Sequence, residues 1–255
     1  MHTEDIINFL RELNENNNRE WFAQNKSRYE RVRSKFEEIS RLLIAEISVF
    51  DNDIKNVDVK DCVFRIYRDI RFSTDKTPYK THFGVYIASA GGRKSQRGGY
   101  YLHLDPAGCF LGVGVWCPPP PLLKALRKSV YDNIDELNEI RHSADFKTTY
   151  PGFFEEDKLK NVPPGFPRDF PDADLLKLKH YLVEGKLDMA ITDRDDFVEI
   201  VAEKCRIAYP FNRFFITFSY RHKPVLFHQE QLDNLRQGIP CKQPHTSRQI
   251  LQAYS

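Results

Sequence analysis

The sequence predicts an α+β fold in which an antiparallel meander sheet packs against a long N-terminal helix and C-terminal helices. The helix is indicated by residues 18–50, where apolar side chains recur at steps of three, four and seven and so share one face. The sheet is indicated by residues 51–116, where β-rich runs alternate with short turns. Connections this short favour antiparallel pairing, because parallel strands need long crossovers.

The N-terminal part is predicted to contain two helices. The first starts at Thr3, which can cap it, and its buried face carries Ile6, Ile7, Leu10 and Leu13. The Asn-rich stretch 14–18 ends this helix, since asparagine side chains compete for backbone hydrogen bonds. The long helix then runs from near Asn18 to about Phe50.

Four strands are predicted in the middle of the chain, at residues 62–67, 83–89, 100–105 and 110–116. A basic loop with glycine pairs at both ends joins the second strand to the third. The third and fourth are joined by the turn sequence Asp105-Pro106-Ala107-Gly108. Prolines 118–121 end the sheet, because proline cannot donate a ladder hydrogen bond.

Helices are predicted again after the sheet, at residues 122–131, 134–141, 172–181 and 196–209. Between them, residues 150–171 are rich in proline, glycine and phenylalanine and are predicted to be irregular. From His222 onward the chain is rich in glutamine and histidine. We therefore expect one α+β domain over residues 1–216 and an atypical, loosely ordered polar extension over residues 217–255.

Composition argues against several classes of protein. No apolar run approaches the roughly 20 residues that cross a bilayer, and the N-terminus lacks the features of a secretory signal. We therefore expect a cytoplasmic protein with no membrane contact. The five cysteines are scattered without a CxxC pair, so neither a disulfide framework nor a metal site is predicted. Motifs for phosphate loops, dinucleotides, zinc proteases and serine hydrolases are absent, and no cofactor is predicted.

Positive charge is concentrated near the start of the predicted sheet. The chain has a net charge of +2, yet residues 60–97 hold nine Lys or Arg against three Asp, a net charge of +6. Guanidinium groups bind phosphate or carboxylate through paired hydrogen bonds, while lysine acts as a point charge. The predicted ligand-binding set is Arg65, Arg68, Arg71, Lys76, Tyr79 and Lys80. On an extended strand, Arg65, Tyr67, Asp69 and Arg71 would share one face.

Asp75 and His103 are the candidates for acid–base chemistry if the ligand reacts. Asp75 lies within the basic segment, and His103 shares a strand face with Asp105 at i, i+2 spacing. A histidine near a carboxylate can transfer protons or bind a metal, but the simpler interpretation assigns Asp105 to the following turn. His82 meets His103 only if the strand register brings the two together.

Several segments together resemble a conserved hypothetical family of bacteria and fungi, domain of unknown function 2461. The resemblance spans residues 3–215 and does not include the segment from Thr217 onward. It implies a single α+β domain of bacterial cytoplasmic type and carries no activity with it. The matching segments are Asn17 to Phe22 with Lys26 and Tyr29, Arg65 to Lys80, residues 100–104, residues 112–116 and Pro164 to Pro167.

Two functions are consistent with these patterns. In the first, the basic cluster binds a phosphorylated or other anionic ligand, a small molecule or nucleic acid, with or without catalysis. In the second, the arginines pair with nearby acidic side chains, and the domain is a non-catalytic protein-interaction or structural module. Whether these cations find internal carboxylates, and whether they line a concave site, decides between the two. The oligomeric state and any substrate stay open.

Overall fold

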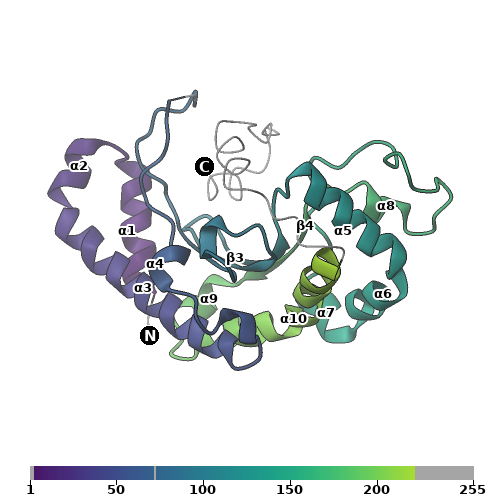
Figure 1. The fold of residues 1–255 in the computed structure, drawn as a ribbon. Coiled ribbons are helices and arrows are strands. Elements are labelled where there is room, and N and C mark those ends of the chain that lie inside the picture. Colours follow the sequence, from purple (N-terminus) through teal and green to yellow (C-terminus); the bar gives the residue numbers. More distant parts are fainter. Residues whose placement is uncertain (1–2, 72, 222–255) are drawn as a thin grey trace.

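The computed structural model describes residues 3–71 and 73–221, and it confirms the predicted α+β class with an antiparallel meander. The strands pair in the order β1-β2-β3-β4, each antiparallel to the next. Figure 1 shows the curved sheet between two groups of helices. The strand bounds are Phe83–Ile87 for β1, Gly99–Leu104 for β2, Cys109–Val115 for β3 and Tyr181–Leu187 for β4.

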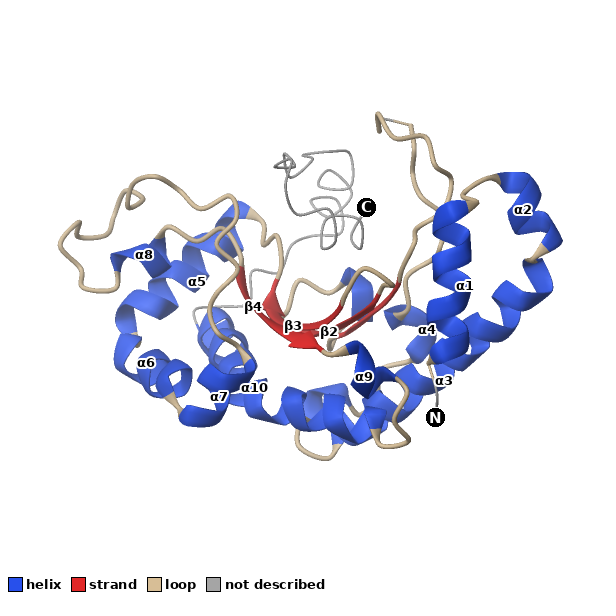
Figure 2. Cartoon of the chain, turned by 180° about the vertical axis from the view of Figure 1, so that it is seen from behind, coloured by secondary structure: helices blue, strands red, loops and turns tan. Residues whose placement is uncertain are grey.

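The N-terminal helices lie at one side of the sheet and most of the later helices at the other, while the long C-terminal helix packs on the sheet between the two groups (Figure 2). The first group is α1 (Glu4–Glu15), α2 (Arg19–Gln24), α3 (Lys26–Ser48) and the short α4 (Val59–Cys62). The later helices are α5 (Pro120–Asp132), α6 (Ile134–His142), α7 (Ala144–Thr149), α8 (Ala173–Leu176), α9 (Met189–Thr192) and α10 (Phe197–Arg221). Single 3-10 turns occupy Asn52–Ile54 and Gly92–Lys94.

The main core lies between the sheet and the long helices α3 and α10. Helix α10 packs against α3, α5 and β3. Alternate strand residues point to this core, where Phe83 of β1 stacks on Phe36 of α3. The intervening strand residues form a second, smaller apolar cluster on the opposite face, with Tyr86, Tyr101 and Phe110 among its members. The sheet is therefore buried on one face by helices and is aromatic on the other.

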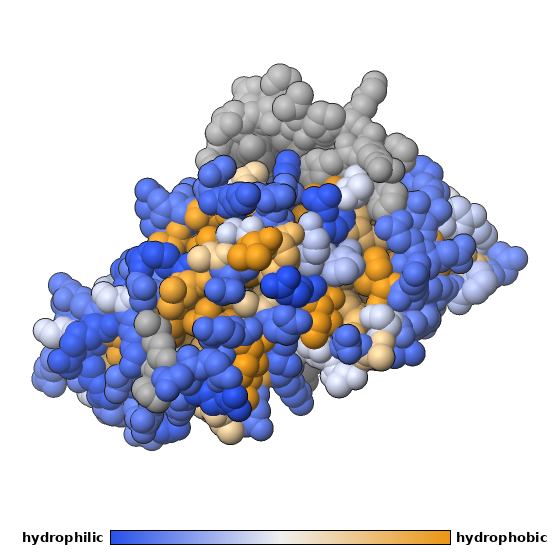
Figure 3. All heavy atoms as spheres, turned by 90° about the horizontal axis from the view of Figure 1, so that it is seen from below, coloured by the Kyte–Doolittle hydropathy of each residue, from blue (hydrophilic) through white to orange (hydrophobic). Residues whose placement is uncertain are grey.

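The outer surface mixes apolar and polar side chains. Figure 3 shows apolar patches interspersed with hydrophilic residues on the side seen from below. Leu42 and Val49, at α3 and its C-terminal end, are 40% and 72% exposed. Among the described residues, no helix combines the length and the hydrophobicity needed to cross a membrane.

Three sequence-based predictions of secondary structure were wrong in detail. The long helix expected from Asn18 is divided at Asn25 into α2 and α3, and Asn18 caps α2 by accepting a hydrogen bond from the Trp21 N–H at 2.9 Å. The helix expected over residues 172–181 is limited to α8. The strand β4 follows it and pairs with β3 along its whole length, which outweighs the local helical preference.

The strand expected at residues 62–67 is replaced by the end of α4 and an irregular segment. Asp58 caps α4 by accepting from the Lys60 N–H at 3.0 Å, and only isolated bridges follow, at Val63 and Tyr67. A shared strand face for the arginines is therefore absent. The prediction that residues 217–255 form a loose extension stays a prediction: α10 continues to Arg221, and residues 222–255 lie outside the described part.

Candidate functional site

Residues 64–82 form a two-armed loop that leads directly into β1. The arms are joined by the Arg68 N–H, which donates to Pro78 O at 3.0 Å, and by the Lys80 N–H, which donates to Ile66 O at 2.7 Å. Pro78 has no N–H to extend this ladder, so the pairing stays short. The loop base is thus held at the end of the sheet, whereas its tip extends away from it (Figure 1).

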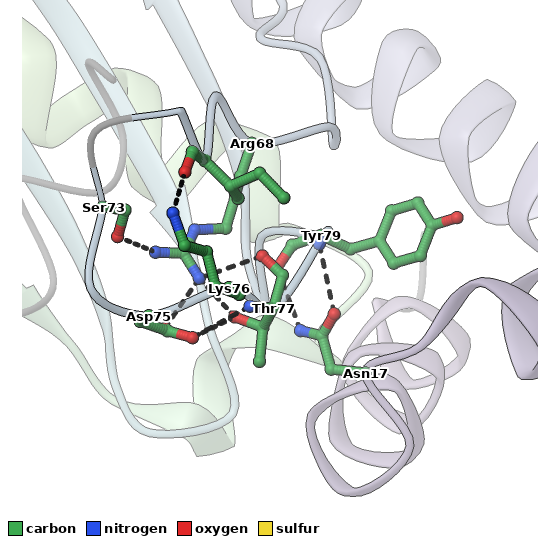
Figure 4. A network of polar contacts seen from close by, with 8 residues as sticks. Asn17, Arg68, Ser73, Asp75, Lys76, Thr77 and Tyr79 are labelled. Atoms are coloured by element: carbon green, nitrogen blue, oxygen red, sulfur yellow. Dashed lines mark hydrogen bonds and ion pairs between the residues drawn. The ribbon is translucent and has the colours of Figure 1, made fainter.

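Arg68 ties the two arms together through its guanidinium group (Figure 4). Its Nη1 donates to Asp75 Oδ2 at 2.7 Å and to Thr77 O at 3.1 Å, and Nη2 reaches Ser73 Oγ at 3.5 Å. Asp75 also accepts from the Thr77 N–H at 2.9 Å, and this backbone bond, with the Arg68 bond, lowers the pKa of Asp75. Asp75, one acid–base candidate, is therefore an ionised partner of Arg68 within the loop.

The loop tip contains two further predicted ligand-binding residues. Arg71 pairs with Asp69 at 2.6 Å, with 75% of the Arg71 side chain exposed. Hydrogen bonding from Arg71 lowers the pKa of Asp69 to about 2. Lys76 donates to Ile70 O at 2.9 Å. These contacts are local and close the tip on itself.

Tyr79 is packed into the protein rather than presented to solvent. Its ring stacks on Phe22 with centroids 3.9 Å apart and is 6% exposed. Asn17 clamps its backbone, since Nδ2 donates to Tyr79 O at 2.9 Å and Oδ1 accepts from the Tyr79 N–H at 3.1 Å (Figure 4). This clamp joins the α1–α2 connection to the loop and positions the next residue, Lys80.

Lys80 is a buried cation at the base of the loop. It is 3% exposed, and its ammonium group lies 5.4 Å from the centre of the Phe64 ring. Burial, followed by repulsion from Arg65 and Arg68, lowers the pKa of Lys80 to about 8. Arg65 is exposed, and among the described residues it has no ion-pair partner. Three cations of the predicted set therefore act on one place at the end of the sheet.

Two histidines and an aspartate lie next to Lys80 on the sheet face opposite α3 and α10. The register pairs Gly84 with His103, so His82, which directly precedes β1, lies beside His103 with ring centroids 4.5 Å apart. Asp105 Oδ2 is 3.7 Å from His103 Nε2, while Asp105 Oδ1 accepts from the Ala107 N–H at 2.7 Å in the turn. We call Lys80, His82, His103 and Asp105 the sheet-end cluster.

Burial controls the protonation of the two histidines. It is the largest cause that holds the pKa of His82 well below its usual value of 6.5, and repulsion from His103 and Lys80 acts in the same direction. The pKa of His103 is also lowered by burial, which outweighs the opposing effect of Asp105. Both imidazoles are therefore neutral near pH 7 and can offer lone pairs.

Tyr101 positions the His103 ring. Its hydroxyl lies 2.8 Å from His103 Nδ1. The space for this hydroxyl depends on Gly84, because a Cβ at that position would lie 2.7 Å from the Tyr101 oxygen. With Nδ1 so engaged, Nε2 is directed towards Asp105. The donor atoms of His82, His103 and Asp105 all lie within 4.8 Å of one another, close enough for one metal ion to bind all three after small side-chain movements.

The structure separates the predicted site residues into three places. Arg65, Arg68 and Lys80 act at the loop base beside His103; Arg71 and Lys76 are at the tip; Tyr79 is packed against Phe22. Sequence reasoning did not predict the metal-ligating geometry. The available signal was the i, i+2 spacing of His103 and Asp105, but His82 joins them only through the strand register.

Comparisons with known proteins place the chain in a family. Neither the curated proteins nor the solved structures contain a match. A family match spans residues 5–214, which include the loop, the whole sheet and most of α10. The chain therefore belongs to the family described as Conserved hypothetical protein (DUF2461).

Proposed function

We propose that this protein binds a small phosphorylated or carboxylated anion at the base of the loop, where Arg65, Arg68 and Lys80 act together. The observation that carries the proposal is the burial of Lys80, 3% exposed, in the field of two guanidinium groups. Three cations that act on one place set up a positive field there, and a bound anion would be attracted to it. Such sites concentrate anions from solution.

The chemistry of the three cations suits an oxygen-rich anion. Arg65 is exposed and has no ion-pair partner among the described residues, so its guanidinium group can engage two ligand oxygens. Arg68 supplies charge while its own donors hold Asp75 and Thr77. The cations occupy a small area rather than a stripe, which favours a small molecule over nucleic acid.

At the loop tip, the contacts of Arg71 and Lys76 favour the alternative, a structural or protein-interaction role, for the tip alone. Arg71 and Asp69 neutralise each other, and Lys76 is bound to a carbonyl of the same loop. The proposal therefore assigns ligand binding to the base and loop closure to the tip. Anion binding at the base requires no reaction. Of the two acid–base candidates, His103 lies near Lys80, whereas Asp75 is paired with Arg68.

A thermal-shift titration tests the proposal. The full chain is melted with inorganic pyrophosphate, a nucleoside monophosphate, a sugar phosphate, citrate and a short oligonucleotide. A ligand at about one hundred times its Kd adds about 2.7 kcal/mol of stability, or about 5–10 °C for a domain of this size. We expect a small anion to raise the melting temperature in wild type and to lose this effect in Lys80→Met and Arg65→Gln.

Matched variants at the loop tip control for net charge. Arg71→Gln and Lys76→Gln each remove one positive charge from the same loop and should keep the shift. If the tip and base variants lose the rise in melting temperature equally, the ligand binds elsewhere or responds only to the net charge of the protein. A response to the oligonucleotide alone, with a steep dependence on salt, would favour nucleic acid instead.

A further inference from the structure

We propose that His82, His103 and Asp105 bind one divalent transition-metal ion. The three side chains offer two imidazole nitrogens and one carboxylate oxygen, all within 4.8 Å of one another. They are 2%, 0% and 7% exposed, respectively. Zinc and ferrous iron accept this donor set, and three protein ligands leave a coordination position for a further molecule.

Unpaired nitrogen atoms support the assignment. Within residues 3–71 and 73–221, neither ring nitrogen of His82 has a hydrogen-bond partner, and His103 Nε2 has none either. Buried polar atoms without partners cost free energy, so three of them on adjoining side chains call for a bound species. Each neutral imidazole has one nitrogen with a lone pair, so a metal ion would satisfy Nε2 of His103 and one of the two ring nitrogens of His82.

The geometry of His103 and Asp105 fits ligation better than a direct hydrogen bond. Their nearest atoms, Nε2 and Oδ2, are 3.7 Å apart, which is too long for a hydrogen bond. Two ligands of a tetrahedral zinc ion, each about 2.1 Å from it, lie roughly 3.4 Å apart. Donor atoms as much as 4.8 Å apart reach the same spacing when the side chains move by up to about 1.4 Å.

Contacts behind the ligands orient them for this role. When His103 Nδ1–H donates to the Tyr101 oxygen at 2.8 Å, the Nε2 lone pair faces Asp105. Asp105 Oδ1 is occupied by the turn at Ala107, which leaves Oδ2 directed to the histidines. Metal-binding histidines commonly use the second nitrogen in this way. Tyr101 is thus a positioning residue.

The ion deepens the proposed function, because an anion could bind the open coordination position and Lys80 together. That combined role rests on the proposed function, whereas the metal site itself does not. Asp105 supplies one negative charge, which offsets part of the charge of the ion. The metal is therefore tested alone, without an anion.

The test is a metal titration of the chelator-treated full chain. Zinc affinity is measured by competition with a chromophoric chelator, and cobalt(II) absorption reports the ligands. We expect one equivalent in wild type, affinity weakened by about 100-fold or more in His82→Asn and Asp105→Asn, and by about 10- to 100-fold in Tyr101→Phe. Asp105→Asn keeps an acceptor for the turn, so a folded variant is available if His82→Asn unfolds.

Controls separate this site from other metal-binding groups. His180→Asn removes a buried histidine elsewhere, and the triple variant His222→Asn/His228→Asn/His245→Asn removes histidines outside the described residues; both should bind like wild type. A cobalt charge-transfer band from thiolate, no stoichiometric binding, or unchanged affinity in both His82→Asn and Asp105→Asn would overturn the proposal.

A comparison of two variants distinguishes the metal site from the proposed function. Lys80→Met should keep zinc and lose the pyrophosphate shift. Zinc binding without any anion response leaves the metal site standing and refutes the proposed function. An anion response without zinc binding refutes the metal site alone.

Discussion

Replacing Asn17 tests how the loop is held to the helices. The Asn17 side chain makes two hydrogen bonds, at 2.9 and 3.1 Å, to the C=O and N–H of Tyr79, which is 62 residues away in sequence. Asn17→Ala removes both bonds and leaves the two backbone groups of a buried residue unpaired. Because Tyr79 immediately precedes Lys80, the same change loosens the base of the loop.

The expected loss is large for a single polar side chain. A typical net hydrogen bond contributes about 1 kcal/mol, and each buried group left without a partner costs about 1–3 kcal/mol. We therefore expect Asn17→Ala to lower the free energy of unfolding by about 2–3 kcal/mol. For a domain of this size, that corresponds to a melting temperature about 4–12 °C lower.

Urea unfolding followed by tryptophan fluorescence measures the difference. Asn16→Ala is the matched control, since Asn16 Nδ2 donates only to Glu12 O, one turn away at 2.9 Å, and the loss should stay below about 1 kcal/mol. Equal losses in the two variants would show that the clamp on Tyr79 contributes nothing beyond a local contact, and the reasoning would fail.

Three other predictions concern stability and reactivity. Burial lowers the pKa of His180 from 6.5 to about 4. The stability that neutral His180 contributes is therefore complete above pH 6.5 and is lost as the pH falls towards 4. His180→Phe should reduce the slope of the unfolding free energy against pH in that window by about 1.4 kcal/mol per pH unit. Burial raises the pKa of the Cys62 thiol to about 12, whereas Cys117 is exposed. Iodoacetamide should therefore label Cys117 far faster than Cys62 in the native protein and label the two cysteines equally in urea, as measured by peptide mapping. Gly114→Ala should lower the free energy of unfolding in urea by about 2 kcal/mol or more, because the φ of Gly114 is +128° and an added Cβ would lie 2.1 Å from the Tyr181 carbonyl oxygen of β4. Gly112→Ala is the control and should change stability little, since its Cβ would lie 3.5 Å from the nearest atom, in the Leu182 side chain.

Much of the meander was predictable because its signals are local. The turn at residues 105–108 and the glycine pairs around the basic loop mark where the chain reverses, and alternation marks β2 and β3. β4 was not predicted, although Glu184 and Lys186 alternate with Val183, Gly185 and Leu187. Its pairing with β3 spans about 70 residues of sequence, a distance at which no local pattern selects the partner.

The candidate site was predictable in its residue types but not in its arrangement. The basic segment was read as one extended strand, whereas Asp69 and Asp75 each accept a hydrogen bond from the N–H two residues on. Such turns compete with strand formation, and together with Pro78 they fold the segment back on itself. This return places Arg71 at the tip of the loop and Lys80 at its base, so Arg65 and Arg71 do not share the strand face that was predicted.

The register of the meander explains why the sheet-end cluster forms where it does. β1 begins where β2 ends, as the pairing of Phe83 with Leu104 shows, so residues just before β1 and just after β2 share one edge. His82 and Asp105 are those residues. Local sequence signals specify the turn after Asp105, and the hydrophobic alternation specifies the register, so the cluster follows from the two together.

In the described part of the chain, buried polar atoms without hydrogen-bond partners gather at this edge of the sheet. Two polar groups in the main core show the usual pairing: Tyr100 donates to Asp51 at 3.0 Å and Thr3 donates to Thr192 O at 2.7 Å. Among the described residues, Arg127 Nε, Glu156 Oε2 and the amide of Asn212 are also unpaired, but each belongs to a single side chain. At the sheet end, unpaired nitrogens of two histidines adjoin a carboxylate and a buried ammonium group. Stability alone would favour apolar residues there, so the retained polarity argues for a bound ion or ligand that supplies the missing partners.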